Sequence, residues 1–363
     1  MLVIRMLTPY IGISVLSFIT LYIFRKVAHP VGLVDKPNER KQHIGAIPLV
    51  GGLTVFSSLC VYLVFFTDPN TSWLQILACL SILTFVGVLD DKFDISYKIR
   101  FFVQICLSII MMTIIGLKIT YLGDLIGVGS ISFGFLGYII TVLAVLGAIN
   151  AFNMVDGIDG LLGGLSVVTF GALAYLFSSS GQTALAGICI ALISTLIPYV
   201  IMNLGLFGKK RKVFMGDSGS MVIGFTAIWL LLEATQVKEQ AVMRPVTALW
   251  LIALPLMDMA AIMVRRVKRG DSPFKPDREH LHHIFQRAGL NSHQTLTAIC
   301  TIALTFAAIG IIGENLAIPE YIMFGLFLGL FGIYYLALAY VWRLLTFFRR
   351  LFKKDSLSYQ QEG

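Results

Sequence analysis

Long runs of apolar residues recur along almost the whole chain, and they limit its fold more than any other feature. About 20 apolar residues cross the hydrocarbon part of a bilayer as a helix. Hydrophobic residues make up 57% of the 363 residues and charged residues only 13%, which leaves more apolar surface than a soluble chain of this length can bury. The sequence therefore predicts an all-α polytopic membrane protein with about 11 transmembrane helices. The candidate spans are residues 3–24, 47–66, 73–89, 99–116, 135–152, 161–178, 183–204, 218–235, 246–264, 295–313 and 320–342.

The distribution of lysine and arginine predicts the orientation of these helices. If the N-terminus faces outward, one set of loops holds nearly all the basic residues, including the run 209–212 and the loop 265–287. The opposite set holds only Arg5, Lys118, Lys238 and Arg244. Loops rich in lysine and arginine stay in the cytoplasm, so we expect the N-terminus outside and the C-terminus inside. Residues 1–342 would form the membrane domain, and the basic tail 343–363 would lie on the inner membrane surface.

The net charge of +8 does not indicate a nucleic-acid-binding protein. The basic residues are spread over every predicted inner loop rather than gathered on one folded module. The chain also contains neither a Walker A loop nor a GxGxxG phosphate loop. Anionic lipid headgroups and anionic substrates are therefore the partners that this charge predicts.

Acidic and histidine residues are concentrated at the predicted cytoplasmic ends of the spans. This concentration indicates a site, because a carboxylate inside a bilayer costs roughly 2.5 to 3.5 kcal/mol and so usually faces a cavity, a partner or an ion. Four clusters could meet at one membrane surface. They are Asp90, Asp91 and Asp94; Asn153, Asp156 and Asp159; Asp217; and His280, His282 and His283.

Each acidic cluster also has a purely structural interpretation. Asp90 and Asp91 could simply end a helix, although an acid there opposes the helix dipole. Asp156 and Asp159, each followed by glycine, could form two Asx turns, whereas their spacing of three residues from Asn153 would instead place all three on one helix face. Asp217 could be the N-cap of the span that follows it.

The histidines and one acid inside a span complete the candidates. His280, His282 and His283 could donate to phosphate oxygens, bind zinc or lie in a solvated loop, and no cysteine or HExxH helix completes a familiar zinc set. Asp258 lies within a predicted span, about 10 Å from Arg265 by helical rise. An acid at that depth indicates either a functional residue with a partner or a hydrogen bond between helices.

Clustered carboxylates at a membrane boundary, ringed by cationic side chains, suit a divalent cation and a polyphosphate. Magnesium prefers oxygen ligands and is commonly held by one or two carboxylates together with substrate phosphates. The location predicts two substrates, a soluble diphosphate from the cytosol and a lipid that approaches within the bilayer. Phosphoryl transfer depends mainly on positioning and charge neutralisation, which such a cluster provides.

Six strings in this order carry a family resemblance: DKPNxRKxH, PLVGG, LDDKFDIS, NAFNMVDGIDGLLGG, KVFMGDSGS and DRxHxHH. Together they span nearly the whole chain, and the chain resembles the polyprenyl-phosphate N-acetylhexosamine-1-phosphate transferases. The resemblance implies transfer of N-acetylglucosamine 1-phosphate from UDP-N-acetylglucosamine to undecaprenyl phosphate, with UMP as second product. It also implies a catalytic membrane domain in the bacterial inner membrane, a periplasmic N-terminus, Mg²⁺ or Mn²⁺ as cofactor, a homodimer, and a role in lipopolysaccharide biosynthesis.

The resemblance implies roles for individual residues by motif. Asp217 would be the leading metal ligand, while Asp90 and Asp91 would meet the lipid phosphate and the metal. The predicted nucleotide site is formed by Asn153, Asp156 and Asp159, with Asn203 and Phe214 holding and stacking the uracil. The predicted diphosphate ligands are His280, His282, His283 and Arg265.

The histidine motif separates branches of this family. The branch that transfers phospho-N-acetylmuramoyl-pentapeptide has three consecutive histidines, whereas Leu281 interrupts the run here, which favours N-acetylglucosamine as the sugar. The alternatives are another UDP-N-acetylhexosamine or the pentapeptide donor, and more distantly a secondary transporter. Transporters place their key residues near the bilayer midplane, whereas these acids lie on one face. Either direct attack by the lipid phosphate or a double displacement through an aspartyl phosphate would give the product.

Overall fold

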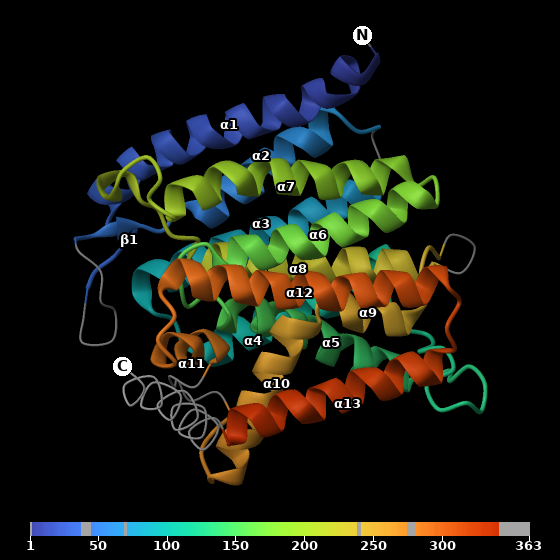
Figure 1. Cartoon of the computed structure of the whole chain (residues 1–363). Helices are drawn as coiled ribbons and strands as arrows, with labels where there is room; N and C mark the ends of the chain where they lie inside the picture. The colour runs from blue at the N-terminus through green and yellow to red at the C-terminus, as the bar shows by residue number, and fades with distance from the viewer. Residues whose placement is uncertain (1, 38–44, 69–70, 238–240, 274–279, 341–363) are drawn as a thin grey trace, which may run out of the picture.

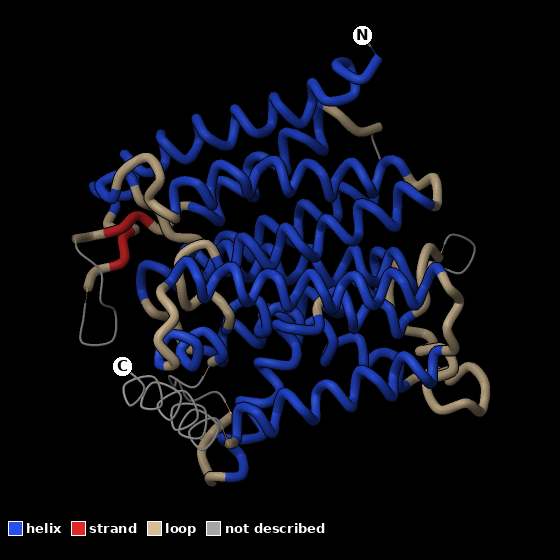
Figure 2. Tube along the Cα trace, viewed as in Figure 1, coloured by secondary structure: helices blue, strands red, loops and turns tan. Residues whose placement is uncertain are grey.

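The computed structural model of the protein describes residues 2–37, 45–68, 71–237, 241–273 and 280–340. These residues form a bundle of helices with one very short antiparallel strand pair (Figures 1 and 2). The long helices are α1 (Leu2–Val31), α3 (Thr71–Phe93), α4 (Tyr97–Ile110), α5 (Leu136–Met154), α6 (Leu161–Ser179), α7 (Thr183–Asn203), α8 (Gly216–Gln236), α12 (Ser292–Asn315) and α13 (Glu320–Ala339). The remaining elements are β1 (Val34–Asp35), β2 (Ile47–Pro48), α2 (Gly51–Phe65), the π-helical turn Met111–Ile115, the 3₁₀ turn Lys209–Arg211, α9 (Pro245–Leu251), α10 (Ala253–Lys268) and α11 (Leu281–Arg287).

The predicted all-helical, multi-span architecture is confirmed. Within the described residues, nine helices are long and apolar enough to cross a membrane, or ten if the bent pair α9–α10 counts as one span. Each of the eleven predicted runs overlaps one of these elements or the shorter apolar helix α2, which has 15 residues. The predicted basic tail at 343–363 lies outside the described residues.

The ninth predicted span is broken rather than continuous. α9 and α10 meet at an angle of 80°, with Ile252 between them. Pro255 has no backbone N–H to offer the Leu251 carbonyl, so an unbroken helix would leave that carbonyl unpaired. The hydroxyl of Thr169, on α6, donates to the Leu251 carbonyl at 3.2 Å instead. The proline therefore allows the bend, and α6 supplies the missing hydrogen bond.

α8 is the central helix of the bundle. It packs against α2, α3 and α5, and nearly all its side chains are buried. Two glycines let the neighbouring helices come close: a Cβ atom at Gly52 would lie 2.2 Å from the Gly219 nitrogen, and one at Gly87 would lie 2.2 Å from the Ser218 Cα. This packing explains the second glycine of the PLVGG motif, because any side chain there would push α2 away from the start of α8.

The elements that carry the predicted site meet at one end of the bundle. Figure 1 shows β1 and α11 at this end, whereas α1 begins at the opposite end. A parallel bridge holds the PLVGG segment against the segment that precedes α8: the Phe214 N–H donates to the Pro48 carbonyl at 2.8 Å, and the Gly51 N–H donates to the Phe214 carbonyl at 3.0 Å. Segments about 165 residues apart in sequence are thereby joined beside Asp217.

Candidate active site

The start of α8 is held by an acid from another helix. Asp91, in the last turn of α3, accepts from the backbone N–H of Asp217 at 2.7 Å and from that of Ser218 at 3.2 Å. The Ser218 hydroxyl also donates to Asp91, at 3.0 Å. The first N–H groups of a helix lack partners within the helix, and a negative charge there is favoured by the helix dipole. The interpretation of Asp217 as the N-cap is therefore wrong, because Asp91 supplies that role from α3.

The Asp217 side chain is consequently available to the site. Its Oδ1 accepts from the Asn153 amide of α5 at 2.5 Å and lies 3.5 Å from Nη1 of Arg100 of α4. The same Arg100 nitrogen donates to Asp90 at 2.6 Å. The Asp217 side chain is 35% exposed, whereas that of Asp90 is 3% exposed. Asp217 can thus meet a ligand, while Asp90 is committed to a buried ion pair.

The loop after α5 carries the other two predicted acids. α5 ends at Met154, so only Asn153 lies on the helix, and the predicted continuous helix face through Asp156 and Asp159 is wrong. Gly157 and Gly160 follow these acids, and Gly160, whose φ is +78°, is the N-cap of α6. The Asp156 side chain is partly in contact with solvent, but many protein atoms lie around it. Desolvation by these atoms, followed by the charges of Asp217 and Asp159, raises the pKa of Asp156 to about 7.

The predicted uracil residues lie beside this loop. The Asn203 amide is buried, and both its ends are used within the chain: its oxygen accepts from the Gly160 N–H at 2.5 Å, and its nitrogen donates to the Val213 carbonyl at 2.8 Å. This geometry gives Asn203 a part in holding two loops together. Phe214 is half-buried, with the Lys212 ammonium 5.5 Å from its ring centre, and Lys212 also pairs with Asp159. The Lys212 ammonium therefore contacts both the Phe214 ring and the Asp159 carboxylate.

The rings of the three histidines lie in sequence against one another at the start of α11. The rings of His280 and His282 are 5.6 Å apart and nearly parallel, and the His282 and His283 rings are 4.2 Å apart. His282 is buried against Gly157, since a Cβ atom on that glycine would lie 2.2 Å from its ring. Burial, followed by the charges of its two histidine neighbours, lowers the His282 pKa to about 3. These surroundings favour the neutral form of His282, which can still donate one ring N–H to a phosphate oxygen.

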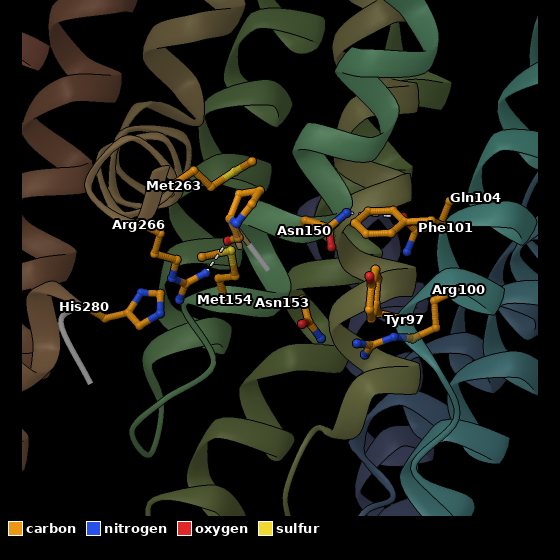
Figure 3. Close-up of a pocket in the computed structure, with 11 residues that line it drawn as sticks. Tyr97, Arg100, Phe101, Gln104, Asn150, Asn153, Met154, Met263, Arg266 and His280 are labelled. Atoms are coloured by element: carbon orange, nitrogen blue, oxygen red, sulfur yellow. Dashed lines mark hydrogen bonds between the residues drawn. The ribbon is translucent and has the colours of Figure 1, made fainter. Parts of the chain in front are cut away.

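A cavity of about 260 Å³ lies between His280 and the pair Arg100 and Asn153, the two residues that contact Asp217. Figure 3 shows Tyr97 and Arg100 on one side of it, Asn153 between, and Arg266 and His280 on the other side. The complete lining is Tyr97, Arg100, Phe101, Gln104, Asn150, Asn153, Met154, Met263, Arg266, Pro273 and His280. Two arginines and a histidine beside aromatic and methionine side chains suit a ligand with an anionic head and an apolar body.

The arginine that α10 contributes to this lining is Arg266, not the predicted Arg265. Adjacent helical residues point about 100° apart, and Arg266 is the one of the two that lines the cavity. Arg266 is buried and donates to the Pro273 carbonyl at 2.6 Å. Arg266 is therefore a second candidate for the diphosphate-binding role that was predicted for Arg265.

Sequence reasoning missed the cations that organise the site. Arg100, Lys212 and Arg266 were interpreted only as inner-loop charges, which lysine and arginine normally are. The available signal was the position of Arg100 in the first turn of an apolar helix, ten residues after Asp90. In the part of the chain that the structure describes, no group of three His, Cys, Asp or Glu side chains is arranged to hold a metal without a substrate.

Comparison with known proteins agrees with the motifs. The sequence model of glycosyl transferase family 4 matches residues 73–235, which include both Asp91 and Asp217. The chain is 52% identical to an undecaprenyl-phosphate alpha-N-acetylglucosaminyl 1-phosphate transferase of Yersinia pestis, over 95% of this chain and 94% of the relative. A protein of the same name from Salmonella typhimurium is 49% identical, over 97% of this chain and 96% of the relative. Another from Haemophilus influenzae is 47% identical, over 92% of this chain and 94% of the relative. The resemblance predicted from the six strings is confirmed: the chain belongs to glycosyl transferase family 4, among the polyprenyl-phosphate N-acetylhexosamine-1-phosphate transferases.

Proposed function

We propose that the protein transfers N-acetylglucosamine 1-phosphate from UDP-N-acetylglucosamine to undecaprenyl phosphate, giving undecaprenyl-diphospho-N-acetylglucosamine and UMP. The observation that carries this proposal is the meeting of Asp217, Asn153 and Arg100 at the edge of a cavity lined by further cations and apolar side chains. An anionic donor and a lipid phosphate both need such neutralisation. The names of the relatives support the same pair of substrates.

The proposed setting is the bacterial inner membrane, with eleven passes and the site on the cytoplasmic face. Counting the nine long helices, the bent pair and α2 as spans gives this number. An odd number places the ends of the membrane domain on opposite sides, in agreement with the distribution of basic residues. The product would be the first lipid-linked intermediate of a surface polysaccharide such as lipopolysaccharide. A homodimer stays a prediction of the family resemblance.

The donor set fits a divalent cation of the magnesium type. Asp217 offers an accessible carboxylate, and Asp156 lies close enough for its pKa to respond to the Asp217 charge. One or two carboxylates together with substrate phosphates form a usual magnesium site, so no third protein acid is required. Asp217 would be the main ligand, with Asp91 behind it fixing the α8 backbone. The ion would neutralise the diphosphate and stabilise the departing UMP.

We propose direct, in-line attack as the reaction path. An oxygen of the lipid phosphate forms a bond to the sugar-linked phosphorus of the donor, and the bond from that phosphorus to the UMP oxygen breaks. A phosphate monoester has a second pKa near 6, so the attacking oxygen is already ionised at pH 7 and needs no strong base. Asp90 is held by Arg100 and is nearly inaccessible, which fits a supporting role. Trapping of a stoichiometric, acid-labile phospho-enzyme from donor alone would instead establish double displacement.

The function is tested with purified protein in detergent or lipid. We expect UMP release from UDP-N-acetylglucosamine only when both undecaprenyl phosphate and Mg²⁺ or Mn²⁺ are present. Mass spectrometry of the lipid product, with UDP-N-acetylglucosamine and UDP-N-acetylgalactosamine as paired donors, identifies the sugar. Absence of UMP with every donor, while the protein remains folded, would refute the proposal.

Replacement of Asp90 by asparagine is expected to leave measurable activity. The change removes one charge-assisted bond to Arg100, of about 1.5 to 3 kcal/mol, so kcat should fall by about tenfold to a hundredfold. The remaining rate should rise with pH as the lipid phosphate loses its second proton, whose pKa is near 6. UMP release across a pH series, with the wild-type protein beside it, measures both effects. An equal, pH-independent loss in the Asp90→Asn and Asp217→Asn variants would contradict this division of roles.

A further inference from the structure

Asp258 lies on α10, is only 3% exposed, and has partners on two other elements. Its Oδ2 is 2.7 Å from Nδ1 of His280, which precedes α11. Its Oδ1 accepts from the Leu281 N–H at 3.1 Å and from the Tyr334 hydroxyl of α13 at 2.7 Å. One carboxylate thus joins α10 to the start of α11 and to α13. An acid that only linked two helices would need one partner, whereas the Asp258 carboxylate has three.

These contacts fix which nitrogen of His280 can face a ligand. A carboxylate can only accept, so the ring nitrogen facing Asp258 carries the hydrogen. Nδ1 is therefore occupied in both charge states of the ring, and Nε2 is the nitrogen left for other partners. Figure 3 shows the His280 ring directed toward the cavity, on the side of Arg266. The direction of the ring and the identity of its free nitrogen are set by the same acid.

We infer that Asp258 is a positioning residue for the transfer reaction, one that holds His280 with Nε2 toward the substrate phosphates in the cavity. The inference rests on the proposed function and adds a residue that touches no substrate itself. Carboxylates behind a metal-binding histidine orient its ring, and their loss typically lowers metal affinity or activity by about tenfold to a hundredfold; we expect an effect of that size for His280 facing phosphates. Tyr334 and the Leu281 N–H hold the other oxygen of Asp258, so the carboxylate cannot turn away from the ring.

A double-mutant cycle separates this role from simple structural support. Asp258→Asn keeps the size of the side chain, but its amide can present a hydrogen to Nδ1 and so favours the other tautomer. We expect Asp258→Asn and His280→Gln each to lower kcat by about tenfold to a hundredfold, and the double variant to be no slower than the slower single one. Effects that multiply in the double variant would overturn the inference. Tyr335→Phe, one residue along α13, is the matched control, because the Tyr335 hydroxyl contacts Lys268 rather than Asp258, and kcat should change by less than about threefold.

A measurement on the unmutated chain keeps the inference testable if Asp258→Asn does not fold. In protein labelled with ¹⁵N-histidine, the His280 signals are identified by their loss in His280→Gln. We expect Nδ1 to carry a hydrogen at pH 7 to 8, and a bare Nδ1 would refute the role of Asp258. This signal does not depend on turnover. If the wild-type protein released no UMP, the proposed function would fail, while the ¹⁵N result would still decide the Asp258 geometry.

Discussion

The Asp217→Asn variant is expected to lose about a thousandfold in kcat, at every magnesium concentration. Asp217 is an accessible carboxylate of the proposed site, and its Oδ1 already lies within reach of Asn153 and Arg100. Asparagine would keep the shape but remove the charge that a divalent cation needs. Loss of metal-based charge stabilisation is worth several kcal/mol, and about 4 kcal/mol corresponds to about a thousandfold in rate. The rate of UMP release, measured over a magnesium titration, gives the result.

Asp94→Asn is the matched control for this charge change. Asp94 is an exposed acid near the same end of the bundle, and its φ of 51° is a conformation that asparagine also adopts readily. The control should keep activity within about twofold of wild type, because exposed substitutions of this kind are usually close to neutral. Recovery of the Asp217→Asn variant at high magnesium would show that Asp217 only tunes metal affinity.

The Gly216→Ala variant is expected to lower kcat by about a hundredfold or more, although it removes no polar group. Gly216 has a φ of +76°, where a side chain costs about 1 to 2 kcal/mol. A Cβ atom there would also lie 2.4 Å from an oxygen of Asp91. The acid must then move away from the start of α8, which shifts Asp217 within the site. Errors of about 1 Å in such positions can cost about a hundredfold.

Gly181→Ala separates strain from the displacement of Asp91. Gly181 has the same φ of +76°, lies between α6 and α7, and has no atom within 4 Å of the position that a Cβ would take. Both variants carry the same backbone strain, so thermal unfolding should shift in the same direction in both. Only Gly216→Ala should lose catalysis in the UMP assay. Equal activity losses would show that strain alone is responsible.

The helical architecture could be predicted because hydrophobic length is a local property of the sequence. The bend after Leu251 was missed, because its stability depends on a hydroxyl from Thr169, 82 residues earlier. A proline in an apolar run leaves one helix carbonyl without its usual N–H donor. The sequence does not reveal whether a neighbouring helix supplies another donor to that carbonyl. Sequence alone therefore indicates where a membrane helix can break, and packing decides whether it does.

The clustering of these acids could be predicted because a charge in an apolar run is costly and therefore stands out. Their partners were missed for the opposite reason, since Arg100 and Lys212 fit the expected distribution of inner-loop cations. The contact between Asp91 and Asp217 spans 126 residues and leaves no local pattern. Asp258 was singled out by its depth, but its bond to His280 joins residues on separate elements and emerged only in three dimensions.

The dependence of α8 on Asp91 has a consequence for biogenesis. α3 is synthesised long before α8. Asp91 therefore cannot accept hydrogen bonds from the backbone N–H groups of Asp217 and Ser218 until α8 has been made. α8 in turn has no side chain of its own to close its first turn. Neither segment is complete without the other, so the contact between Asp91 and the start of α8 cannot form before α8 itself has been synthesised and inserted.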